Sequence, residues 1–174
     1  MLEALQNRPL CSAVWASHGD VVSIPIDLND TVRKAISLAA GNGWGCFRPI
    51  IDLASELPLV LGNRVQIQKV LDNLLLNAAE AMREAGAPES AIAITTKLTP
   101  NAKQAQVTIR DYGPGLSAEM AARIFEPFFT TKDTGIGLGL AISRTLIEAH
   151  GGNLWSDTEA GPGATFHFTL PLNL

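Results

Sequence analysis

The sequence has few of the features that mark secreted, membrane-spanning or metal-stapled proteins. It contains two cysteines, Cys11 and Cys46, which form no CxxC or Cys/His cluster, so reduced thiols are expected rather than a disulfide framework or a zinc site. No apolar run approaches the roughly 20 residues that a membrane span needs. The opening segment lacks the basic start and continuous apolar stretch of a signal peptide. These absences favour a cytoplasmic protein without direct membrane insertion.

Positive charge is also scarce. The chain has 13 Lys and Arg against 17 Asp and Glu, which gives a formal net charge of -4. Because nucleic-acid phosphates bind clustered Lys and Arg, nucleic acid is excluded as the main partner. With 47% hydrophobic and 17% charged residues, the 174-residue chain is typical of one folded domain with a sizeable core.

Hydrophobic spacing predicts a domain of mixed helices and strands. The periodicity and the Gly, Pro and Asn breaks predict strands over 24–26, 48–54, 91–98, 105–111, 153–157 and 164–172. Helices are expected from a cap at Asn29 or Asp30 to Gly41, from 64 to about 85, briefly after Ser117, and from about 138 to 149. Two hairpin-like strand pairs make much of the sheet antiparallel, so an α/β sandwich is expected.

Three glycines alternate at the start of the last predicted helix, in "TKDTGIGLGLAIS" (131–143). A helix N-terminus offers unpaired N–H groups and a positive dipole end, and Gly135, Gly137 and Gly139 would let phosphate oxygens approach them. The spacing is neither GxGxxG nor a P-loop. Taken alone, the run is equally compatible with a tight turn that packs a helix.

The long helix carries two asparagines one turn apart, Asn73 and Asn77, beside its apolar stripe. Asn is a mediocre helix former, because its amide competes for backbone partners. The amide oxygen of Asn77 would suit Mg²⁺, which takes few protein ligands alongside phosphate oxygens and water. A solvent-facing polar row that includes Lys69 and Glu84 is the alternative interpretation.

The segment "DYGPG" (111–115) follows a predicted strand. Asp111 could accept a hydrogen bond from an exocyclic amine such as that of adenine, and Gly113 and Gly115 would open space for a flat ring. An ordinary turn is the alternative.

The loop "IFEPFFTTK" (124–132) gathers half of the six phenylalanines of the chain: Phe125, Phe128 and Phe129. This clustering indicates either a flap anchored by aromatic side chains over a ligand or the core packing of a loop.

In chain order, the helix segment with Asn73 and Asn77, the segment 111–115, the loop 124–132 and the glycine run resemble the N, G1, F and G2 boxes. These boxes mark the ATP-binding catalytic domain of sensor histidine kinases. The wider superfamily includes DNA gyrase, chaperone and mismatch-repair ATPases, and the resemblance covers about residues 24–172. It implies a two-layer α/β sandwich of a mixed, mostly antiparallel sheet with three main helices (the Bergerat or GHKL fold). The catalytic domain would span 24–174, and residues 1–23 would be a linker or the remnant of a dimerisation helix.

The resemblance also implies the roles of individual residues, with ATP and Mg²⁺ as cofactors. Asn77 would hold Mg²⁺ with Asn73 as its companion, and Asp111 would read adenine. Residues 116–134 would form a lid, in which Lys132 either meets the phosphates or is a flexible, solvated lysine. The other nucleotide-binding residues that it implies are Gly113, Gly115, Phe125, Phe128, Thr131, Gly135, Gly137, Leu138, Gly139, Leu140 and Thr165.

One position separates kinase from ATPase. The hydrolases of the superfamily have a water-activating glutamate one turn before the magnesium asparagine, where this chain has Asn73, which cannot take a proton as a carboxylate would. Asp72 and Glu80 are expected to point elsewhere on the helix. Transfer to an external nucleophile is therefore favoured over hydrolysis. The alternatives are an ATP-dependent binding module without chemistry, or an ATPase or serine kinase of the same superfamily.

The acceptor histidine of such a kinase is followed by an acidic residue on an upstream hairpin, and no such pair occurs here. His18 is followed by glycine and not by an acid. His150, which is expected to be partly cationic at a helix end, is interpreted as structural, and so is His167. The acceptor is therefore expected on a dimerisation or histidine-phosphotransfer domain of the same or a partner kinase, with a response regulator downstream. The chain would not phosphorylate itself, and its parent kinase could be membrane-anchored.

Overall fold

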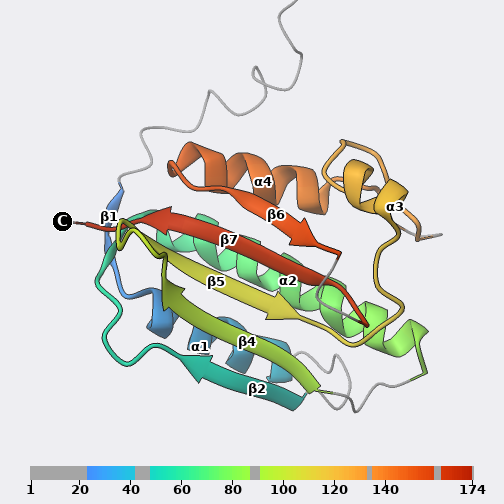
Figure 1. Cartoon of the computed structure of the whole chain (residues 1–174), viewed down its shortest axis with the longest axis horizontal. Coiled ribbons are helices and arrows are strands. Elements are labelled where there is room, and N and C mark those ends of the chain that lie inside the picture. Colours follow the sequence, from blue (N-terminus) through green and yellow to red (C-terminus); the bar gives the residue numbers. More distant parts are fainter. Residues whose placement is uncertain (1–22, 42–47, 87–90, 133–134, 159–161, 174) are drawn as a thin grey trace, which may run out of the picture.

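The computed structural model describes residues 23–41, 48–86, 91–132, 135–158 and 162–173 (Figure 1). The predictions about His18 and most of residues 1–23 lie outside these ranges. Helices α1, α2 and α4 lie together on one side of a sheet, behind it in the view of Figure 1. The elements are β1 (Ile24–Ile26), α1 (Leu28–Gly41), β2 (Arg48–Leu53), β3 (Val60–Gly62), α2 (Arg64–Glu84), β4 (Ala91–Leu98), β5 (Gln104–Arg110), α3 (Ala118–Arg123), α4 (Gly139–Ala149), β6 (Leu154–Asp157) and β7 (Thr165–Pro171).

The main sheet is mixed and mostly antiparallel, as predicted. Its five strands lie in the order β2-β4-β5-β7-β6, and only the β2–β4 pair among them is parallel. Strands β1 and β3 form a separate antiparallel ribbon. The strand β3 was not predicted; it pairs with β1, which is distant from it in the sequence. The fold class is confirmed: three long helices and the short α3 accompany the sheet.

The core lies between this sheet and α2. Alternate side chains of the central strands point to the helix side and are buried there, while their neighbours point to the open face. Burying one such side chain stabilises the fold by about 1.5–3 kcal/mol. The buried residues of this layer include Leu71, Leu74, Ile92, Ile94, Val107, Ile109, Phe166 and Phe168.

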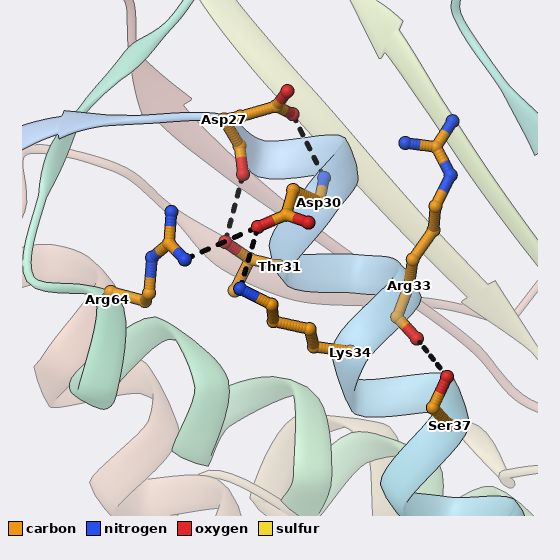
Figure 2. Close-up of polar contacts among 7 residues, drawn as sticks. All are labelled: Asp27, Asp30, Thr31, Arg33, Lys34, Ser37 and Arg64. Carbon is orange, nitrogen blue, oxygen red and sulfur yellow. Dashed lines mark hydrogen bonds and ion pairs between the residues drawn. The ribbon is translucent and has the colours of Figure 1, made fainter.

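The cap of α1 differs from the prediction. The carboxylate of Asp27 accepts the backbone N–H of Asp30 at 2.9 Å, and the hydroxyl of Thr31 donates to the Asp27 carbonyl oxygen (Figure 2). Asp27 therefore caps the helix, which begins at Leu28, and neither Asn29 nor Asp30 does so. The prediction considered only Asn29 and Asp30, whereas Asp27 lies directly before Leu28, whose side chain is 1% exposed.

The two residues expected as caps have other roles. Asn29 is buried; its amide donates to the Ala54 carbonyl oxygen at 2.8 Å and accepts from the Thr96 hydroxyl at 2.7 Å. Asp30 pairs with Lys34 at 3.0 Å and with Arg64 at 3.3 Å (Figure 2). The hydrogen bond and charge of Lys34, with the charge of Arg64, lower the pKa of Asp30 below its ordinary value.

His150 fixes the end of α4 against the start of α2. Its Nε2 accepts the backbone N–H of Asn63 at 2.9 Å, and its Nδ1 lies 2.7 Å from the Leu146 carbonyl oxygen. A backbone N–H can only donate and a carbonyl only accept, so the ring is a neutral imidazole protonated on Nδ1. The expectation of a partly cationic His150 is corrected, because a cationic ring could not accept from Asn63.

His167 lies on the open face of the sheet, opposite Phe166 and Phe168, and its contacts are structural as predicted. Its ring stacks on Trp155 with centroids 5.1 Å apart, and its Nδ1 lies 2.8 Å from the Thr108 hydroxyl. Burial lowers the pKa of His167. Within the described ranges, no helix has the length and apolarity to cross a bilayer.

Candidate functional site

A cavity of about 600 Å³ opens between α2, the loop after β5, the segment that follows α3 and the start of α4. The four sequence segments that were predicted to act together therefore meet at one place. The predicted site residues that line it are Asn73, Asn77, Asp111, Gly115, Thr131, Lys132, Gly135, Gly137, Leu138, Gly139 and Leu140.

Four predicted site residues lie outside this lining. Gly113 and Thr165 support the wall, since Gly113 donates its N–H to Asp111 and Thr165 is buried on β7. Phe125 packs edge-on against Phe166 in the core, with ring centroids 6.4 Å apart. Phe128 is 73% exposed. The aromatic residue of this loop that lines the cavity is Phe129.

Asp111 is the most buried carboxylate of the cavity wall, with 2% of its surface exposed. Its Oδ1 accepts two backbone N–H groups, from Gly113 at 2.9 Å and from Ala164 at 3.0 Å. Burial raises the pKa of Asp111, and the two N–H bonds and the charge of Arg110 oppose this shift. Since both bonds use Oδ1, the second oxygen can accept from a ligand.

Asn77 faces a lysine of the lid. The ammonium of Lys132 lies 3.2 Å from the Asn77 Oδ1 and also pairs with the carboxylate of Glu80. Glu80 lines the cavity, so the expectation that it points elsewhere on α2 is wrong. Its spacing contained the signal: Glu80 is seven residues after Asn73, close to two full helical turns. Asp72 does bond elsewhere, with Gln68 at 2.8 Å.

Asn73 joins α2 to α4. Its Nδ2 donates to the Ser143 hydroxyl at 3.0 Å. Its Oδ1 lies so close to Gly139 that a Cβ added there would be 2.5 Å away. Asn73 therefore fixes the position of the helix start that forms the floor of the cavity.

The alternating glycines are required by the packing of the chain itself. Gly137 has a φ of +72°, accepts the N–H of Phe128 at 2.8 Å, and a Cβ there would lie 2.6 Å from the Phe128 carbonyl carbon. A Cβ on Gly135 would lie 2.6 Å from the Thr130 hydroxyl. This close packing brings the start of α4, where Leu138 supplies no side-chain cap, to the cavity wall. The first N–H groups of the helix can therefore bind an anionic ligand.

The sequence profile of the family described as "Histidine kinase-, DNA gyrase B-, and HSP90-like ATPase" matches residues 62–174. The chain belongs to this family. The matched span contains every predicted site residue, from Asn73 to Thr165, and the whole cavity lining.

Curated relatives of this chain are named as sensor proteins or histidine kinases. The sensor protein FixL of Bradyrhizobium diazoefficiens is 50% identical over 114 residues, which are 65% of this chain and 22% of FixL. The signal transduction histidine-protein kinase AtoS of Escherichia coli is 40% identical over 149 residues, 85% of this chain and 24% of AtoS. The chain thus spans about a quarter or less of these two relatives.

Solved histidine kinase structures have the same fold. The nucleotide-free catalytic domain of the histidine kinase ThkA has a TM-score of 0.73 at 31% identity, over 86% of this chain and 95% of that one. Full-length ShkA in complex with AMPPNP has a TM-score of 0.71 at 29% identity, over 88% of this chain and 32% of ShkA. These similarities confirm the predicted resemblance to a histidine kinase catalytic domain.

Proposed function

We propose that this chain binds Mg-ATP and donates the γ-phosphoryl group to a histidine on a separate dimerisation or histidine-phosphotransfer domain. The observation that carries the proposal is the convergence of Asp111, Asn77 and the start of α4 on one cavity, in a chain of this ATPase family. A response regulator would receive the phosphoryl group next, and the ATP would come from the cytoplasm.

Asp111 recognises the base. A carboxylate oxygen only accepts hydrogen bonds, and adenine presents an amine donor at the position where guanine presents a carbonyl acceptor. With Oδ1 already bonded to Gly113 and Ala164, Oδ2 accepts this amine. The site therefore selects adenine over guanine.

The phosphates bind at the start of α4 and under the lid. Backbone N–H groups at Gly139 and Leu140, together with the positive end of the helix dipole, stabilise negative charge there. Lys132 supplies a full positive charge from the lid.

The residues at Asn77 fit a magnesium ion. Mg²⁺ prefers hard oxygen ligands and is bound by one or two protein groups, with phosphate oxygens and water completing its octahedron. The Asn77 amide oxygen is such a ligand and already attracts a cation, the Lys132 ammonium. Among the described residues, no group of three or more His, Cys, Asp or Glu could hold a metal by itself, so phosphate has to contribute. When bound, Mg²⁺ neutralises phosphate charge.

Transfer is favoured over hydrolysis by the side chains of α2. Asn73 cannot accept a proton as a carboxylate would, and its amide is bonded to Ser143. In the nucleotide-free chain the Glu80 carboxylate is paired with the Lys132 ammonium. Positioning of the ATP and neutralisation of its phosphate charge then favour attack by an external nucleophile.

The test is phosphoryl transfer in trans. The chain is incubated with Mg²⁺ and γ-labelled ATP together with an isolated dimerisation domain that carries an acceptor histidine. We expect acid-labile label on that domain, none when its acceptor histidine is replaced by alanine, and strong reduction with Asn77→Ala. Nucleotide binding without label would indicate a binding module instead, rapid phosphate release would indicate an ATPase, and stable label on a histidine of this chain would contradict the proposed acceptor.

A further inference from the structure

Glu80 and Lys132 connect α2 to the lid at the edge of the cavity. Both side chains are about 30% exposed, and their charged groups are in contact. On α2, Glu80 and Asn77 are three residues apart and so lie side by side, one turn along the same face. The Lys132 ammonium therefore has two partners on one helix, the Glu80 carboxylate and the Asn77 amide oxygen.

The backbone of the lid holds Lys132 in this position. The Thr130 hydroxyl accepts the Lys132 N–H at 3.1 Å, and the Lys132 carbonyl oxygen accepts the N–H of Gly135 at 3.2 Å. These two bonds fix the backbone of Lys132 through both its N–H and its carbonyl oxygen. The ammonium is thus directed at α2 from the lid side and held by Glu80 from the helix side.

The Asn77 oxygen cannot serve two cations at once. An ammonium lies 3.2 Å from it, and Mg²⁺ ligands lie at about 2.0–2.1 Å. Two positive charges that share one oxygen would be a few ångströms apart in a partly desolvated cavity, where their repulsion is much stronger than in water.

We propose that Glu80 is a positioning residue that holds the Lys132 ammonium on the Asn77 amide oxygen, so that Lys132 and a divalent cation occupy this oxygen in turn. The proposal rests on the role of Asn77 in the proposed function. In the nucleotide-free chain the lysine neutralises the site and fixes the lid to α2. Entry of the metal with the nucleotide releases Lys132 from Asn77 and frees it to meet the phosphates.

The holding role of Glu80 is tested by the reactivity of Lys132 with an amine-acylating reagent, quantified by mass spectrometry in the nucleotide-free chain. A paired ammonium must leave its partner and lose a proton before it reacts. We expect Glu80→Gln to raise the labelling of Lys132 about threefold or more relative to the exposed Lys97 in the same sample. An unchanged ratio would overturn the positioning role.

The exclusion of metal by lysine is tested with ADP, which has no γ-phosphate for Lys132 to contact. The Mg²⁺ concentration that half-saturates ADP binding is measured by calorimetry for the native chain, Lys132→Met and the double variant Glu80→Gln with Lys132→Met. The double variant has the net charge of the native chain, so a change in its midpoint does not come from net charge. We expect its Mg²⁺ midpoint to be about three- to tenfold lower than the native one, and that of Lys132→Met lower still.

The matched control removes an ion pair of α1, away from the cavity: Asp30→Asn with Lys34→Met (Figure 2). This control should leave the Mg²⁺ midpoint unchanged. If Asn77→Ala raises the midpoint but the Glu80 and Lys132 double variant matches the native chain, the present inference fails and the proposed function stands. If the native chain binds no ADP, or Asn77→Ala changes nothing, both fail.

Discussion

At the scale of single residues, the two oxygens of the Asp111 carboxylate have different tasks. Oδ1 accepts the N–H groups of Gly113 and Ala164 and so ties the loop after β5 to the start of β7. Oδ2 is the oxygen that we propose accepts the ligand. Burial without a neutralising partner in direct contact raises the pKa of Asp111, so the charge needed for recognition weakens the fold.

Asp111→Asn should separate these two tasks. The amide oxygen of asparagine can keep both N–H bonds, which turns its Nδ2 toward the base, where a donor would meet the adenine amine. We expect ATP affinity to fall about tenfold or more, measured by calorimetry, while the variant stays folded. A variant that binds ATP as tightly as the native chain would contradict the assignment of Asp111.

The same variant has a predicted pH signature. Because the folded-state pKa of Asp111 is raised, the contribution of this carboxyl to the free energy of unfolding is greatest where it is protonated, and this contribution is lost as the pH rises through that raised value. Asp111→Asn lacks this loss. Its stability relative to the native chain, measured by urea unfolding, should therefore increase as the pH rises above the ordinary aspartate value of 3.8.

Residue types predicted the chemistry of the cavity better than its pairing. Asn77 and Asp111 were predicted from an amide beside the apolar stripe of a helix, from an acid at a strand end, and from the resemblance of their motifs to the family. Glu80 was missed, since a glutamate on a helix is ordinarily solvated and its partner, Lys132, is 52 residues away. Phe128 was expected at the nucleotide. Its φ is +67°, and in such an irregular loop no sequence period predicts the direction of a side chain.

At the scale of elements, the contact between α2 and α4 sets the shape of the cavity floor. Gly139 begins α4 directly against the Asn73 amide, whose other end is bonded to Ser143. A side chain at 139 has to displace Asn73 and break that bond.

Gly139→Ala should cost about 1–3 kcal/mol of unfolding free energy, because its Cβ would lie 2.5 Å from the Asn73 Oδ1. In an Asn73→Ala background the obstacle is gone, and alanine in a helix is favoured over glycine by about 0.5–1 kcal/mol. We therefore expect Gly139→Ala to be neutral or stabilising there. Equal costs in both backgrounds, measured by urea unfolding, would show that Asn73 and Gly139 do not interact.

The long elements were predictable because their periods are local. The 3.6-residue stripe of α2 and the alternation of β4 gave the observed bounds to within one or two residues. The cap of α1 and the strand β3 were not predictable in this way. Asp27 caps α1 through its bond to the Asp30 N–H, and β3 exists through its pairing with β1, from which α1 and β2 separate it in the sequence.

At the scale of the whole molecule, the sheet positions the loop that carries Asp111. Asp111 follows β5 and Ala164 precedes β7, and these strands are neighbours, so two segments 53 residues apart meet at one end of the sheet. The mixed sheet class was predictable from the strand patterns and the family resemblance. The strand order and the parallel β2–β4 pair were not, because pairing between distant strands leaves no local period in the sequence.

The central claim is that this cavity holds a magnesium-bound adenine nucleotide, and a crystal structure of the chain with a non-hydrolysable ATP analogue and Mg²⁺ tests it most directly. We predict the adenine amine on Asp111 Oδ2, the metal on the Asn77 amide oxygen, and the phosphates at the N-terminus of α4 with the Lys132 ammonium moved from Asn77 toward them. A nucleotide bound elsewhere on the surface, or a cavity closed by its own side chains, would contradict the account.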